Sequence, residues 1–131
     1  MDMSDSMCEN LAKALSGEGK TEKDICKVTI HRSDINAVIG NKKFSSTDHM
    51  FDFGPADANG NALITGEMVL LENEVPGVVA GLTNAGIIVS AIHTHWLFDS
   101  PKLIYIHVES ITNPMNFATR TAQILRENTS H

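Results

Sequence analysis

The stretch from residue 87 to residue 108, IIVSAIHTHWLFDSPKLIYIHV, contains two apolar runs separated by a polar turn. Apolar and β-branched residues dominate both runs, which is typical of strands. The first run, Ile87 to Leu97, and the second run, Leu103 to Val108, are joined by Asp99-Ser100-Pro101, a sequence that favours a turn. The stretch therefore predicts a β-hairpin, and the rest of the fold is built outward from it.

Three histidines fall on one face of this predicted hairpin. Because side chains alternate across a strand, His93 and His95 point to one side, and His107 shares a side with Tyr105 on the returning strand. A turn centred near Ser100 sets His93 opposite His107 and His95 opposite Tyr105. Directly paired Cβ atoms lie roughly 5 Å apart and next-nearest ones roughly 7 Å apart. The three imidazoles can then converge on one metal ion, whereas a one-residue slip would turn His107 to the opposite face.

The type of ligand indicates the kind of metal site. Three histidines with an open fourth position are the ligand set of a catalytic zinc ion, whereas a structural zinc site is closed by four protein ligands. Neutral imidazole also binds nickel, copper and ferrous iron, so the ligands do not fix the metal, and a divalent ion, zinc first, is expected. An HxH pair on a strand is more often two partly exposed histidines, so the hypothesis depends on the third.

Several acidic residues are candidates for a role beside the histidines. Glu67, within an apolar run, and Glu109, on the face of His107, are the candidate catalytic acid/base residues. For Glu109 an edge salt bridge is the plainer alternative, and Glu109 and Tyr105 are also candidates for a fourth ligand or a partner that orients an imidazole. Glu74, with Glu72, is expected to interact favourably with a helix dipole. His31 and His49 have no spacing that ties them to the hairpin, and His131 is expected to play no part.

The remaining segments predict helices and further strands. Helical spacing and caps indicate helices ending at Gly17 to Gly19, over Asn73–Ala85, and from Asn113-Pro114 onward. Strands are expected at the segments 27–32, 35–39, 49–53 and 62–71, with a loop over 41–48 and an Asn-Gly turn at 60. Strands joined by short turns predict an α+β fold: a mostly antiparallel sheet with about three helices packed on it.

Length and charge limit the classes of function. The 131 residues fit a single domain, 1–131, with a core over about 27–125 and an N-terminal helix within 1–19. The net charge of −6 and the scattered basic residues argue against a nucleic-acid partner. No apolar run reaches membrane-spanning length, so no membrane partner is expected.

The two cysteines and the first ten residues bear on the cellular compartment. Cys8 and Cys26 form neither a C-x-x-C pair nor a disulfide framework, so two reduced thiols are expected. Residues 1–10 are acidic and polar and do not have the pattern of a secretory signal. We therefore expect a cytoplasmic protein, or a mature form whose leader is not in this sequence.

The chain resembles the LppY/LpqO-like domain family, a bacterial family of unknown function, over roughly Lys27 to Leu125. The resemblance is carried by these segments: Gly66-Glu67-Met68-Val69-Leu70, Glu72-Asn73-Glu74-Val75-Pro76-Gly77-Val78, Asn84-Ala85-Gly86-Ile87, Ala91-Ile92-His93-Thr94-His95, Pro101 and Ile106-His107. The resemblance implies recurrent histidines at 93, 95 and 107 and recurrent acids at Glu67, where Asp is expected, and at Glu74. Thr94 departs from the expected Asn, and no lipoprotein leader is present. The unit looks duplicated in longer relatives, which implies that this single-copy chain pairs as a homodimer.

Three functions are consistent with these observations. The first is a metal-dependent hydrolase or decarboxylase of a small oxygenated molecule, in which the histidines hold the metal and Glu67 or Glu109 transfers protons. The HxH pair with a later histidine is loosely similar to zinc enzymes such as acetolactate decarboxylase. The second is a non-enzymatic module that binds a metal or a small ligand, and the third is an interaction domain without metal. The sequence has no nucleophile elbow and no phosphate-binding loop, so enzymatic chemistry would depend on the metal.

Overall fold

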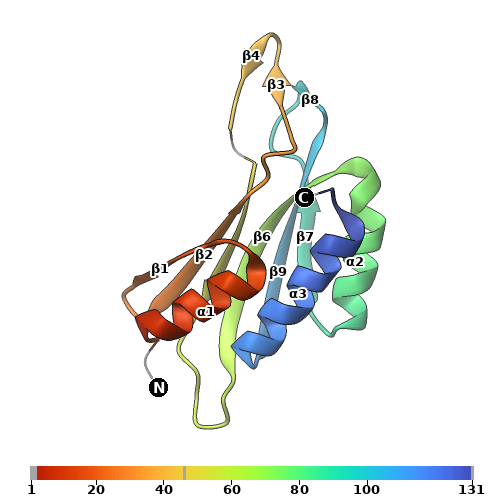
Figure 1. Ribbon diagram of the computed structural model, residues 1–131. Coiled ribbons are helices and arrows are strands. Elements are labelled where there is room, and N and C mark those ends of the chain that lie inside the picture. Colours follow the sequence, from red (N-terminus) through yellow and green to blue (C-terminus); the bar gives the residue numbers. More distant parts are fainter. Residues whose placement is uncertain (1–2, 46, 131) are drawn as a thin grey trace.

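The computed structural model describes residues 3–45 and 47–130 and has one large antiparallel sheet with three helices beside it (Figure 1). The elements, in chain order, are α1 (Asp5–Leu15), β1 (Glu18–Glu22), β2 (Ile25–His31), β3 (Val38–Ile39), β4 (Lys42–Lys43), β5 (Asp48–Phe53), β6 (Ala62–Leu71), the 3₁₀ turn η1 (Glu72–Glu74), α2 (Val75–Asn84), β7 (Ile88–His93), β8 (Asp99–Ser100), β9 (Leu103–Thr112) and α3 (Pro114–Asn128). The predicted α+β class is confirmed. None of the helices in these two ranges is both long and apolar enough to cross a membrane.

The large sheet has the strand order β1-β2-β5-β6-β9-β7, and every neighbouring pair is antiparallel. The chain reaches β7 from β6 through α2, so β9 later inserts between these two strands. A second, small sheet has the order β4-β3-β8 and extends from one end of the large sheet (Figure 1). β6 and β9 pair along ten residues each and form the centre on which the candidate site is built.

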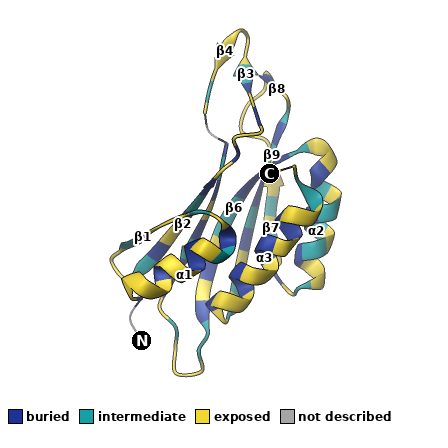
Figure 2. Ribbon diagram, in the orientation of Figure 1, coloured by how far each residue is buried: buried dark blue, intermediate teal, exposed yellow. Residues whose placement is uncertain are grey.

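All three helices cover the same face of the large sheet. Val28, Phe51, Met68 and Ile106 point to this face from four strands and share one buried cluster with side chains of α1, α2 and α3. The helices are accordingly buried on the side toward the sheet and exposed on the other (Figure 2). No helix of the described residues packs on the opposite face, which we call the open face and which carries Lys27, Thr29 and Glu67 among others.

The N-terminal helix is attached to the sheet by a disulfide bond, which corrects the expectation of two reduced thiols. Cys8 of α1 and Cys26 of β2 are bonded, with their Cα atoms 5.4 Å apart, and both are buried. The pairing escaped sequence reasoning because one side chain lies on a helix and the other on a strand. Ser4 is the N-cap of this helix, and its hydroxyl accepts a hydrogen bond from the Met7 N–H.

The second helix packs closely on the third. A Cβ atom added at Gly81 would lie 3.0 Å from Ile124 of α3, so the small residue permits a close helix–helix contact. Gly86 has a φ of 77°, a left-handed conformation that suits glycine after the last helical turn, as expected.

Other elements differ in extent from their predictions. β1 was not predicted, because its sequence is polar and it pairs only with β2. The strand expected over 35–39 is reduced to β3, and the loop expected over 41–48 contains β4 and the first residue of β5. The long strand expected to reach Leu97 ends at His93, so His95 lies in a loop. Ser46 and His131 lie outside the described residues.

Candidate metal centre

His93, His95 and His107 lie together on the open face at the β7–β9 hairpin. One ring nitrogen from each residue lies within 4.8 Å of those of the other two. The ring of His93 is central, with its centroid 5.1 Å from that of His95 and 5.0 Å from that of His107. Ligand bonds to zinc of roughly 2.0–2.1 Å hold two ligand nitrogens at most about 4.2 Å apart, so the rings would have to move closer together to bind one ion.

The predicted register of the hairpin is wrong by two residues. His93 pairs with Tyr105, and Ala91 pairs with His107, instead of the expected pairing of His93 with His107. A two-residue shift leaves every side chain on its original face, which is why the histidines still meet. The shift arises because the connection between β7 and β9 is a loop with its own short strand, β8, and not a tight turn at Ser100.

His95 lies outside the strand ladder and is positioned by aromatic contacts. Its ring stacks on that of Tyr105, with centroids 3.5 Å apart and an interplanar angle of 4°. The Trp96 ring makes T-shaped contacts with His95 and Phe44, with centroid distances of 6.0 and 6.1 Å, and the Trp96 indole hydrogen-bonds to the Tyr105 hydroxyl. Burial, with nearby carboxylates, raises the pKa of Tyr105, so its phenol stays protonated at neutral pH.

A lysine that sequence reasoning did not single out organises this loop. The Lys102 ammonium donates hydrogen bonds to the backbone carbonyls of Trp96 and Leu97, 3.0 and 3.1 Å away, and to the Asp99 carboxylate. Asp99 is buried and also accepts a hydrogen bond from the Leu103 N–H at 2.9 Å. Burial alone would raise the pKa of Asp99, but these hydrogen bonds outweigh it and lower the pKa. Asp99 therefore stays ionised and holds the loop that carries His95.

Glu67 is the acid that the structure places beside the histidines. It lies on β6 directly opposite His107, so both side chains are on the open face. Its two carboxylate oxygens lie 3.7 Å from His95 Nε2 and 4.0 Å from His107 Nε2. The side chain is 23% exposed, which leaves one side of the carboxylate accessible to a bound molecule.

The other candidate acids lie elsewhere. Glu109 points to the open face two residues beyond His107, opposite Thr65, and makes no ion pair with any residue of the described ranges. Glu74 is buried and binds Arg32 through both oxygens, at 2.5 and 2.9 Å, so it is part of the core and does more than interact with a helix dipole. Glu72 is exposed in the same turn.

The two remaining described histidines are not part of the cluster. His31 pairs with Asp48 at 2.6 Å across β2 and β5. His49 is buried on the helix side of β5, where its Nδ1 accepts a hydrogen bond from the Val69 N–H. These positions agree with the sequence analysis, in which no spacing connected His31 or His49 with the hairpin.

A shallow depression of about 340 Å³ adjoins the cluster on the open face. Glu67 and His107 form one end of it, and the ion pair between Lys27 and Asp52 lies toward the other. Thr29 and Thr65 contribute hydroxyl groups between these ends. A small polar molecule bound in this depression would contact both the carboxylate of Glu67 and the imidazole of His107.

Comparison with known proteins gives a family but no activity. No curated protein and no solved structure matches the chain significantly. A family of domains matches residues 9–127, which includes most of α1, the whole sheet and nearly all of α3. The chain therefore belongs to the family described as a domain of unknown function (DUF1259).

Proposed function

We propose that the chain binds one divalent transition-metal ion, zinc first, through His93, His95 and His107. The support is their convergence: two strands and a loop bring three imidazoles within 4.8 Å of one another on an accessible face. Neutral imidazole is a common metal ligand, and the three ring nitrogens are close enough that movements of the rings would bring them to a single ion.

The function that we propose for this centre is hydrolysis or decarboxylation of a small oxygenated molecule. A metal bound by three histidines would polarise a carbonyl group or lower the pKa of a bound water. Glu67 is the proposed proton donor and acceptor, because its carboxylate lies beside two of the three ligands and borders the depression. Glu109 is the weaker candidate for this role, since it lies farther along β9.

The second candidate is a non-enzymatic homodimeric module that holds a metal or a small ligand. The exposure of His93 and His95 favours it, because an open site exchanges its ligand readily and excludes little water. The homodimer, the bacterial origin and the closer relation to LppY/LpqO-like proteins are part of this proposal. The buried disulfide favours an oxidising compartment over the cytoplasm.

Metal content distinguishes the metal proposals from a domain without metal. Tag-free protein is analysed by elemental mass spectrometry after dialysis, beside His93→Ala, His107→Ala and the control His31→Ala. We expect close to one equivalent of metal in the native chain and in the control, and loss in both cluster variants. A native chain that neither carries metal nor takes up added zinc, nickel or iron would contradict the proposal.

Activity then separates the enzyme from the binding module. Glu67→Gln is nearly isosteric and removes the charge, so it should retain metal and lose turnover of carbonyl or ester substrates, by about 10²–10⁴-fold for a lost general acid or base. Glu109→Gln is the matched control and should retain turnover. Metal-loaded native protein that turns over no substrate of these classes would favour the binding module.

A further inference from the structure

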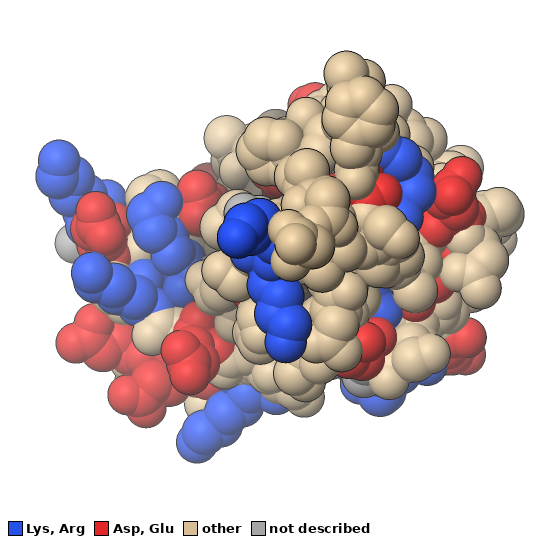
Figure 3. Space-filling model, turned by 90° about the horizontal axis from the view of Figure 1, so that it is seen from above, with Lys and Arg blue, Asp and Glu red and all other residues tan. Residues whose placement is uncertain are grey.

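One long run of the chain contains no charged residue. Residues 75–98 include no Asp, Glu, Lys or Arg, although the chain is 20% charged and a run of this length would carry about five at that frequency. The run forms α2, β7 and the loop with His95, which together make up one edge of the molecule (Figure 1). Viewed from above, charged side chains gather at the left and again at the right, and the surface between them is mostly uncharged apart from a few Lys or Arg side chains (Figure 3).

The two edge strands of the large sheet, β1 and β7, differ in charge. β1 carries Glu18, Lys20 and Glu22 on an exposed strand, and such charges prevent a second sheet from pairing with an edge. β7 has no charged residue, and Ile88 and Ile92 are more than half exposed on it. Among the strands described, β7 pairs only with β9, with an irregularity between Val89 and Ala91, so its outer edge has no strand partner.

From this edge we propose an interface between two copies of the chain, in which β7 pairs antiparallel with β7 of the second copy. The proposal supplies the interface of the homodimer named above and rests on that part of the proposed function. Identical strands that pair antiparallel are related by a two-fold axis, so each contact occurs twice. An axis near Ser90 and Ala91 would join the two sheets into one and place residues 94–97 of each copy beside residues 84–87 of the other.

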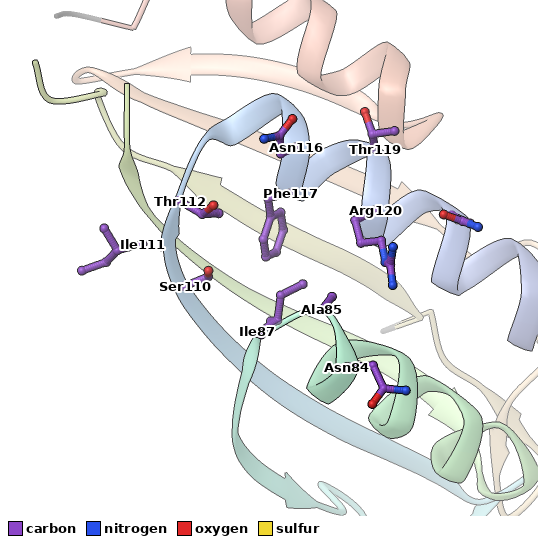
Figure 4. A pocket seen from close by; sticks show the side chains of 12 residues that line it. Asn84, Ala85, Ile87, Ser110, Ile111, Thr112, Asn116, Phe117, Thr119 and Arg120 are labelled. Carbon is purple, nitrogen blue, oxygen red and sulfur yellow. The ribbon is translucent and has the colours of Figure 1, made fainter. Parts of the chain in front are cut away.

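The two ends of β7 are complementary under this symmetry. After β7, the loop presents Leu97 and Phe98, the most exposed large apolar side chains of the described residues at 82% and 77%. Before β7 lies a hollow of about 590 Å³ between α3 and the turn that follows α2. The buried side chains of Phe117 and Ile87 point into it, and polar side chains, among them Asn84, Asn116 and Arg120, also line it (Figure 4). The two-fold axis places the loop of each copy at the same end of the joined sheet as the hollow of the other.

A second copy fits this edge better than an unrelated partner does. The protruding loop and the hollow lie at opposite ends of one strand. A two-fold axis therefore forms the same loop-to-hollow contact at both ends of the interface, and no other surface of the molecule is needed. Each chain carries a net charge of −6, so two copies approach with less repulsion along an edge strand that carries no charge, and among the described residues Arg120 is the one charged residue that lines the hollow. β9 runs beyond the start of β7, because Ile88 faces Glu109, so Ser110 to Thr112 line the hollow without covering it.

The test measures mass and the position of contact on the full chain. Native protein should sediment as a particle of twice 14.2 kDa at micromolar concentration. Leu97→Ser/Phe98→Ser should raise the dissociation constant about 10⁴-fold, since the two side chains are each buried twice and each of these four burials accounts for roughly ten-fold. Leu63→Ser, at an exposed leucine of the open face, is the matched control and should leave the constant unchanged.

Cross-linking locates the contact. A photoreactive benzoyl-phenylalanine replaces Phe98 in a mixture of ¹⁴N- and ¹⁵N-labelled chains, and peptides joined between the two labels should contain residues 84–87 or 110–123. A monomer, a dimer unaffected by the double variant, or cross-links to other surfaces would overturn the proposal. Metal content of the same samples keeps the two proposals apart: a metal-free dimer retains the interface, and a metal-loaded monomer retains only the centre.

Discussion

Replacing Glu74 by alanine should strongly destabilise the protein. Arg32 is 0% exposed and Glu74 is 6% exposed, and the two form a bidentate ion pair. Burial alone would lower the pKa of Arg32, but hydrogen bonds and charges from Glu74 and Asp34 outweigh it and raise the pKa. Arg32 therefore stays charged when Glu74 is removed, and its buried charge loses its main partner.

The magnitude separates two roles for this carboxylate. Breaking a buried pair costs about 3–5 kcal/mol, whereas a favourable position at a helix start contributes about 0.3–1 kcal/mol. Asp34 still binds Arg32 at 2.7 Å, so we expect the lower end, about 3 kcal/mol, which lowers Tm by roughly 10 °C in a chain of this size. The Glu74 carboxylate also accepts a hydrogen bond from the Leu71 N–H, which would be lost as well.

Urea unfolding followed by circular dichroism measures the effect, with Glu72→Ala as the control at an exposed acid of the same turn. The control should change the free energy of unfolding by less than about 0.5 kcal/mol. Arg32→Met combined with Glu74→Leu should recover much of the loss, because it leaves no unpaired buried charge. A Glu74→Ala loss below about 1 kcal/mol would refute the reasoning.

Three further predictions concern the loop and the disulfide. Tyr105→Leu should weaken metal binding about 10–100-fold, because His95 loses the ring on which it stacks. Tyr105→Phe keeps the stacked ring and should change the metal affinity little. Competition with a chromogenic chelator measures the affinity of both variants. The pKa of Asp99 is lowered in the folded state, so the ionised carboxylate stabilises the fold above a pH of about 4, and this contribution is lost as the pH falls through the lowered value. Urea titrations should therefore show that the difference in unfolding free energy between native protein and Asp99→Asn shrinks on acidification below a pH of about 4. A difference that stays constant would contradict this. Cys8→Ser/Cys26→Ser should cost about 2–4 kcal/mol of unfolding free energy, measured against native protein without reductant, and an unchanged value would show that the bond does not stabilise the fold.

Alternation of side chains was sufficient to predict the face of the histidines but not their partners. For His93 and His107 the face depends only on the parity of their positions in the strands, so it survived a two-residue error in register, whereas His95 lies beyond β7 and reaches the same face through its stacking on Tyr105. The register depends on the loop, which is organised by contacts of Lys102 with two carbonyls and a buried carboxylate. Such contacts join residues a few positions apart through the backbone, and no side-chain pattern signals them.

Long-range pairings were the other features that the sequence did not reveal. Glu67 was a candidate because an acid in an apolar run is unusual, but its position depends on the pairing of β6 with β9, forty residues later. Glu74 and Arg32 are 42 positions apart in the sequence, and each residue alone resembles an ordinary surface charge. The disulfide joins residues 18 positions apart on two kinds of element, so spacing gave no indication of it.

The most direct test of the metal centre observes the histidine rings themselves. Long-range ¹H–¹⁵N correlation spectra, recorded while zinc is added to metal-free protein, report each imidazole separately. We predict that the ring nitrogens of His93, His95 and His107 shift together and saturate at one equivalent, while those of His31 and His49 stay unchanged. Shifts at His31 or His49 in place of the cluster, or no saturable shift at one equivalent, would contradict the account.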